Sequence, residues 1–162
     1  MTRIIYPTPE GVAVIIPAPE CGLSIEEIAA KDVPAGTPYE IVTADEIPSD
    51  RTFRNAWVMG NCCVDHDLGK CKEIGHDKRR VARAEEFVPH DEVIAKQIPG
   101  TDAAAAETAR QAIRDKYSSI QEAIEDAKTP DEIKAALAAG HLDDLTPQTN
   151  PKDITPWLTV RF

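Results

Sequence analysis

The sequence is poor in aromatic residues and contains no long apolar run. Aromatic side chains make up 5% of the 162 residues, against 42% for all hydrophobic types. Many of the apolar positions are alanine, which removes little area from water when it is buried. We therefore expect a thin core, sufficient for one ordinary domain or for a small domain with a helical extension.

Segments that would direct the chain to a membrane are also missing from the sequence. No stretch approaches the roughly 18 apolar residues of a membrane-spanning helix. The opening residues 1–7 do not form the uninterrupted apolar stretch of a signal peptide. We expect a cytoplasmic protein, with no membrane partner.

Positive charge is scarce. The chain has 18 Lys and Arg against 28 Asp and Glu, which gives a formal net charge of −10. Such a surface repels phosphate backbones, so we expect no nucleic-acid partner. The basic run 78–80 with Arg83 is a possible phosphate contact. However, Asp77, Glu85 and Glu86 interleave with it, which favours ion pairs along a solvated helix.

Sequence motifs that are typical of enzymes are absent as well. There is no phosphate-cradling glycine loop, no G-x-S-x-G elbow and no H-E-x-x-H helix. Cys63 can be paired on paper with His66 or His90 as a nucleophile and base, but a chain with four of each residue type always offers such pairs. We expect no enzyme activity and no cofactor.

The four cysteines are expected to be thiols, because the sequence carries no secretion signal. A zinc site is the alternative hypothesis, since thiolates and imidazoles are the ligands that zinc prefers. Its candidate ligands are Cys62, Cys63, His66 and Cys71. Against it, there is no CxxC pair, and Cys71 and His76 are five apart where helical ligand pairs are three or four apart. The competing interpretation is that Cys71 is a small buried apolar residue.

The first third of the chain has the pattern of a small antiparallel sheet with one helix. β-rich alternation separated by proline and glycine predicts strands, and Ser24 with Glu27 forms a capping box for a helix that runs to about Lys31. Phe53 and Trp57 either finish the sheet or cover its open face. The predicted strands are residues 3–6, 12–16 and 39–43, with 52–59 as the covering segment.

The rest of the chain has helical periodicity. Apolar residues recur every three or four positions over 67–88 and over 101–127, which predicts two long helices joined at 99–100 in an antiparallel hairpin. Pro89 is expected to stop or kink the first of these. A third helix begins at Pro130, which follows a capping threonine, and ends at Gly140.

These patterns predict the α+β fold class and three regions. Residues 1–60 form a small α+β domain, 61–140 the helical hairpin region and 141–162 an extended docking tail. The apolar terminus of that tail is expected either to bind a partner or to return as an edge strand on its own domain. Its apolar residues are Trp157, Leu158, Val160 and Phe162.

The second long helix supplies the other set of candidate partner-binding residues. These are Ile113, Tyr117, Ile120 and Ile124. The apolar face of an amphipathic helix is usually buried in the core, here against the first long helix. A seam for a partner or for a second copy of the chain is the alternative, because a two-helix hairpin is marginal alone.

Several segments resemble small proteins encoded near the tail-fibre genes of tailed bacteriophages. In the first half the resemblance lies in residues 25–36, 38–42 and 48–57, and in the second half in residues 67–74, 110–115 and 129–134. It covers roughly residues 3–138. The chain departs from the pattern at Cys62 and Cys63, at Pro89 and in the tail after Gly140.

The resemblance implies a phage tail accessory protein that binds a tail-fibre or baseplate component, as an assembly chaperone or as a retained virion protein. It offers no catalytic residues to transfer to this chain. The expected locations are the host cytoplasm during assembly and the virion tail, and homo-oligomers are compatible with it. The alternative function is a zinc-containing acidic regulatory module that binds a host protein.

Overall fold

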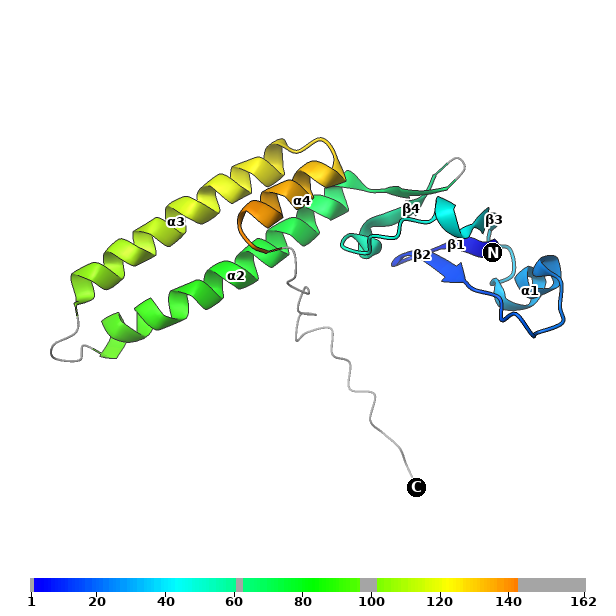
Figure 1. The fold of residues 1–162 in the computed structure, drawn as a ribbon, viewed down its shortest axis with the longest axis horizontal. Coiled ribbons are helices and arrows are strands. Elements are labelled where there is room, and N and C mark those ends of the chain that lie inside the picture. Colours follow the sequence, from blue (N-terminus) through cyan, green and yellow to red (C-terminus); the bar gives the residue numbers. More distant parts are fainter. Residues whose placement is uncertain (1, 61–62, 97–101, 143–162) are drawn as a thin grey trace, which may run out of the picture. The chain divides into compact units, whose positions relative to one another are not determined.

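The computed structural model describes residues 2–60, 63–96 and 102–142, and its fold class is α+β, as predicted (Figure 1). The chain divides into two compact units. Unit 1 comprises residues 1–73 with 128–130, and unit 2 comprises residues 74–127 with those from 131 onward. The division falls later than the expected boundary after residue 60, because a strand pair and the first turns of a long helix belong to unit 1.

Unit 1 contains a three-stranded antiparallel sheet with the strand order β2-β1-β3. Its strands are β1 (Thr2–Thr8), β2 (Gly11–Ile15) and β3 (Glu40–Thr43). The hairpin between β1 and β2 is tighter than the sequence suggested, since Thr8 pairs directly with Gly11. Gly11 has φ +137°, and a Cβ there would lie 3.3 Å from the carbonyl oxygen of Trp57, so only glycine fits this corner.

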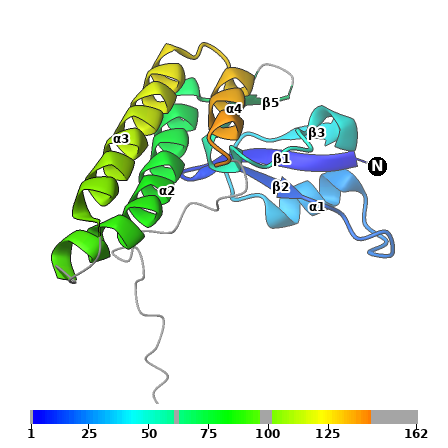
Figure 2. The ribbon, with the colours of Figure 1, turned by 60° about the vertical axis from the view of Figure 1, so that its left-hand side comes forward.

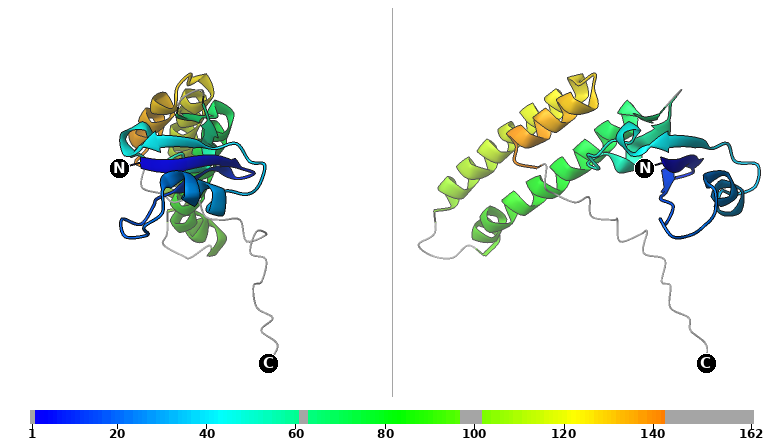
Figure 3. Two further views of the ribbon diagram at one scale, coloured as in Figure 1. Left: turned by 90° about the vertical axis from the view of Figure 1, so that its right-hand side faces the viewer. Right: turned by 45° about the vertical axis from the view of Figure 1, so that its right-hand side comes forward.

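The helix α1 (Ile25–Asp32) begins as its capping box predicted. The Glu27 amide donates to Ser24 Oγ at 3.2 Å, and the Ser24 amide donates to Glu27 Oε2 at 2.7 Å. Its buried residues Ile28 and Ala29 pack with Ile4 of β1 on one side of the sheet (Figure 3, left). The capping residues therefore fix where the helix starts, and the apolar pair fixes which face it covers.

The opposite side of β1 faces a second cluster. Because side chains alternate along a strand, Ile5 points away from Ile4 and packs with Val42 and Trp57. Trp57 begins β4 (Trp57–Met59), which pairs antiparallel with β5 (Val64–His66) as a separate two-stranded sheet. Of the two expectations for residues 52–59, the covering role is therefore the observed one.

Unit 2 is built on α2 (Leu68–Lys96), whose first turns belong to unit 1, with α3 (Ala103–Asp126) and α4 (Pro130–Ala139). Within unit 2, α2 and α3 lie side by side (Figures 1 and 2). Asp91 pairs with Arg110 and Glu86 pairs with Lys116, so residue numbers fall along one helix as they rise along the other. This confirms the predicted antiparallel hairpin. Among the described residues, the helices lack the combined length and apolarity that a bilayer crossing demands.

Pro89 does not stop α2, which continues to Lys96. Proline removes one helical hydrogen bond and crowds the preceding turn. Here α3 holds α2 on both sides of the proline, through Glu86 before it and Asp91 after it. Of the two expectations, a stop or a kink, the stop is therefore wrong, because tertiary contacts outweigh the local preference.

The three helices of unit 2 approach each other closely at two glycines. A Cβ on Gly75 would lie 3.1 Å from Ile133 Cγ2 and 3.5 Å from Ile124 Cδ1. A Cβ on Gly140 would lie 2.7 Å from Ile120 Cδ1. The α4 helix ends near Gly140 as expected, and a side chain at this position would have to displace the tip of Ile120. The left-handed residue is His141, at φ 57°.

Candidate binding surfaces

The predicted seam on α3 lies inside unit 2. Ile113, Tyr117, Ile120 and Ile124 are all buried, with Tyr117 and Ile124 fully inaccessible to solvent. They occupy one face of α3 at heptad-like spacing, which the neighbouring helices cover. These four side chains therefore belong to the core of unit 2. Their role in the core is observed, and their role as partner-binding residues stays a prediction.

The second predicted set lies outside the described residues. Trp157, Leu158, Val160 and Phe162 all belong to the segment 143–162, so the predictions of a docking tail and of an edge strand both stay predictions.

The cysteine and histidine residues that were candidate zinc ligands differ in burial. Cys63 is half-buried just before β5, His66 is half-buried at its end, and Cys71 is fully buried on α2. Within residues 2–60, 63–96 and 102–142, no three His, Cys, Asp or Glu side chains gather closely enough to hold a metal ion. Cys62, the fourth candidate ligand, lies outside these ranges. The burial of Cys71 matches its interpretation as an apolar residue.

An apolar hollow lies on unit 1 between the end of β2 and α1, and we call it the β2–α1 hollow. Its volume is about 180 Å³. Ile16 and Leu23 on its wall are 55% and 45% exposed, although both are large apolar side chains. The wall also includes Ile28 of α1 and the end of β2 at Ile15. Adjacent exposed apolar side chains of this kind are typical of protein-binding surfaces.

A polar network ties α2 to α3 on unit 2. Tyr117 Oη donates to Glu86 Oε1 at 2.8 Å, and Lys116 Nζ donates to the same oxygen at 2.7 Å. Burial opposes ionisation of Glu86, but the two hydrogen bonds outweigh it and lower the pKa of this carboxyl. Burial, and next the bond to Glu86, raise the pKa of the Tyr117 phenol. The Glu86 carboxylate is therefore ionised at neutral pH, and the hydrogen bonds from Lys116 and Tyr117 fix its position.

Arginines gather on the same helical pair, around Phe87 of α2. The guanidinium carbons of Arg83, Arg110 and Arg114 lie 5.3, 5.7 and 5.9 Å from the centre of the Phe87 ring. Distances of this size place a cation within reach of the ring's negative face. Phe87 thus anchors guanidinium groups from both helices.

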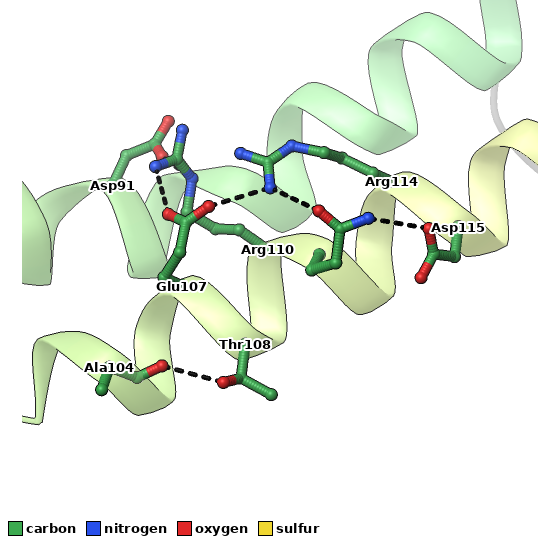
Figure 4. A network of polar contacts seen from close by, with 8 residues as sticks. Asp91, Ala104, Glu107, Thr108, Arg110, Arg114 and Asp115 are labelled. Carbon is green, nitrogen blue, oxygen red and sulfur yellow. Dashed lines mark hydrogen bonds and ion pairs between the residues drawn. The ribbon is translucent and has the colours of Figure 1, made fainter.

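Arg79, Arg83, Arg110 and Arg114 form a row along the two helices, which we call the arginine row. Carboxylates pair with Arg110 and Arg114 at one end of this row. Arg110 Nε lies 3.0 Å from Asp91 Oδ1, and Glu107 accepts from both Arg110 and Arg114 at 2.9 Å (Figure 4). Arg114 also donates to Gln111, whose amide donates to Asp115. The α3 arginines are therefore fixed in position by neighbouring side chains.

The other end of the row borders a depression that we call the arginine groove. Its volume is about 210 Å³. It is lined by Arg79 and Arg83 of α2 and by Arg114, Tyr117, Ser118 and Gln121 of α3. The sequence predicted ion pairs for the basic run, and Arg80 does pair with Asp77 at 2.9 Å. Arg79 and Arg83 have no ion pair within the parts of the chain that the structure describes.

The arginine groove was not predicted, although its signal is visible in the sequence. Arg79, Arg83 and Phe87 are spaced by four residues, as are Arg110 and Arg114, so each set shares one helix face. The pairing register of the two helices, which brings these faces together, could not be derived from spacing alone.

Comparisons with known proteins assign the chain to no family. No protein-family model, no curated protein and no solved structure matches the chain.

Proposed function

We propose that this chain is a protein-binding accessory of a bacteriophage tail, which binds a tail-fibre or baseplate component without catalysis of its own. It acts as an assembly chaperone or stays in the virion. The proposal extends the resemblance that the sequence suggests for residues 3–138, and the observation that supports a binding role is the exposed apolar pair Ile16 and Leu23 beside α1. The proposal requires no cofactor.

The β2–α1 hollow supports this proposal as the first contact surface. Exposed Ile16 and Leu23 gain stability only when another surface removes them from water, at about 25 cal/mol for each Å² covered. The α1 helix, which forms one wall, lies within the resembling stretch 25–36. The resembling stretch therefore borders the hollow, while the exposed apolar side chains Ile16 and Leu23 lie just before it in the chain.

Co-expression with the tail-fibre protein of the same phage or prophage genome tests the proposal. We expect the two chains to co-purify, or the soluble yield of the fibre protein to rise. Replacement of both Ile16 and Leu23 by serine should weaken this effect several-fold. A fibre and a baseplate protein that neither co-purify with the chain nor gain solubility from it would contradict the proposal.

Val88 supplies a matched control. It is 53% exposed, comparable to Ile16 and Leu23, but lies on α2 in unit 2. The Val88→Ser variant removes one exposed apolar side chain at a different place, against two in the hollow variant. It should retain binding if the β2–α1 hollow is the contact, and an equal loss would argue against that surface.

A further inference from the structure

The arginine groove holds positive charge that its own unit does not neutralise. Among the described residues, Arg79 and Arg83 have no carboxylate within ion-pair distance. Their Nε atoms are buried and lack a hydrogen-bond partner there. Their neighbours Arg110 and Arg114 are engaged by Asp91 and Glu107. One end of the row is therefore matched with carboxylates, and the other end is not.

The positive charges of Arg79 and Arg83, at the end of the row that lacks carboxylate partners among the described residues, and of the neighbouring Arg80 repel each other. Burial, and next the like charges of Arg80 and Arg83, lower the pKa of the Arg79 guanidinium, and Glu125 only partly offsets them. An anion seated in the groove would relieve this repulsion. Arg79 and Arg83 are one helical turn apart on α2, and Arg114 faces them from α3.

The anion is expected to be a carboxylate or a phosphate, because the planar guanidinium presents two N–H donors that match two oxygens of either group. A nucleic acid is disfavoured, because a chain with a net charge of −10 repels a polyanion over its whole length. A protein segment with a few acidic side chains brings much less repulsion. Glu107, which bridges Arg110 and Arg114, shows how a carboxylate sits on this row.

We infer that the arginine groove binds an acidic segment of the protein partner, with carboxylate side chains seated on Arg79 and Arg83 beside Arg114. This inference rests on the proposed function, because it takes the partner to be a protein. It assigns that partner a second contact, on unit 2, whose chemistry is ionic where that of the β2–α1 hollow is apolar.

A fluorescent peptide of alternating Glu and Ala tests the groove, titrated with the full chain at low salt and followed by anisotropy. The control peptide carries Gln in place of Glu. We expect saturable binding of the Glu peptide only, weakened by added salt because the contact is ionic. The Arg79→Gln, Arg83→Gln double variant should bind at least about tenfold more weakly.

The control variant removes the same charge elsewhere. Arg51→Gln with Arg54→Gln deletes two exposed positive charges of unit 1 and should leave binding unchanged. Should the glutamine variant not fold by circular dichroism, Arg79→Lys with Arg83→Lys keeps the charge but loses the fork, and a several-fold loss is expected.

Three results would overturn the inference. They are equal affinity for the Glu and Gln peptides, equal losses in the groove and control variants, and binding of inorganic phosphate at this place without binding of the Glu peptide. The proposed function is tested separately. If the groove variant still co-purifies fully with the fibre protein, the groove fails and the function stands. If the peptide binds but no tail protein co-purifies, the function fails and the groove stands.

Discussion

Tyr117 carries both a packing and an electrostatic role. Its ring is fully buried at the α2–α3 contact, and its hydroxyl reaches Glu86 across the helices. Because Lys116 donates to the same carboxylate oxygen, two donors converge on one charge. Such charge-assisted hydrogen bonds are stronger than neutral ones.

The Tyr117→Phe variant should therefore be less stable by about 1–2 kcal/mol at pH 7, measured by urea unfolding. The folded-state pKa of Glu86 is lowered, so its contribution is complete above the ordinary glutamate pKa of about 4.3 and is lost as the pH falls through the lower, folded-state value. The difference between the two proteins should shrink in that acid range. A difference that is constant down to pH 3 would contradict a role for the ionised Glu86.

His141 occupies a left-handed backbone conformation at the end of α4. Its amide donates to Ala138 O, and the Leu142 amide donates to Leu137 O, which is the Schellman pattern. Glycine adopts this conformation without strain. His141→Gly should raise the free energy of unfolding by about 0.5–1 kcal/mol, whereas His141→Val should lower it. Thermal unfolding of both variants checks the order, and a destabilised glycine variant would contradict this reading of the turn.

At the scale of elements, Pro89 is tolerated rather than needed. It lies inside α2, where it removes a hydrogen bond, and it is exposed. Pro89→Ala should therefore stabilise the protein by about 1–3 kcal/mol, because alanine restores the donor. Chemical unfolding measures this gain. No gain, or a loss, would show that the proline shapes α2 in a way that unit 2 requires.

Gly75 permits the close approach of α2 to α3 and α4. Gly75→Leu should destabilise the protein by about 1–3 kcal/mol, because the added side chain would meet Ile124 and Ile133. The matched control is Ala95→Leu, at an exposed position of the same helix, which should be nearly neutral. Urea unfolding of both variants measures the two losses of stability. Equal losses in Gly75→Leu and Ala95→Leu would contradict the close contact at Gly75.

The elements that local chemistry specifies could be predicted from the sequence. Ser24 and Glu27 start α1, and Pro130 starts α4, because capping and proline geometry act within one turn. The pairing of β4 with β5 could not be predicted, since it depends on contacts between distant residues. Local chemistry also left open whether α2 stops at Pro89, because the contacts of α3 on either side of the proline decide it.

The candidate sites were harder to predict than the fold. The apolar face of α3 was identified by its spacing, but spacing does not tell a core face from a partner seam, and Ile124 proved to be in the core. The arginine groove requires the register between α2 and α3, which sets Arg79 against Arg114. The β2–α1 hollow requires the β2 end and α1 to meet across the loop that contains Leu23.

At the scale of the whole molecule, the two candidate surfaces differ in chemistry and lie on different units. Unit 1 offers exposed apolar side chains, and unit 2 offers guanidiniums within a chain of net charge −10. A partner that carries an apolar side chain and an acidic segment would match both. Apolar burial contributes affinity, and the ionic contact adds specificity and a faster association rate.

We propose that this chain acts by binding a tail protein. The most direct test is co-expression of the untagged chain with the affinity-tagged fibre protein of the same phage genome, followed by purification through the tag. We expect the fibre protein to retain the chain, and to retain the Ile16→Ser, Leu23→Ser variant several-fold less than Val88→Ser. Fibre and baseplate proteins that fold, purify and assemble identically without the chain, and never retain it, would contradict this proposal.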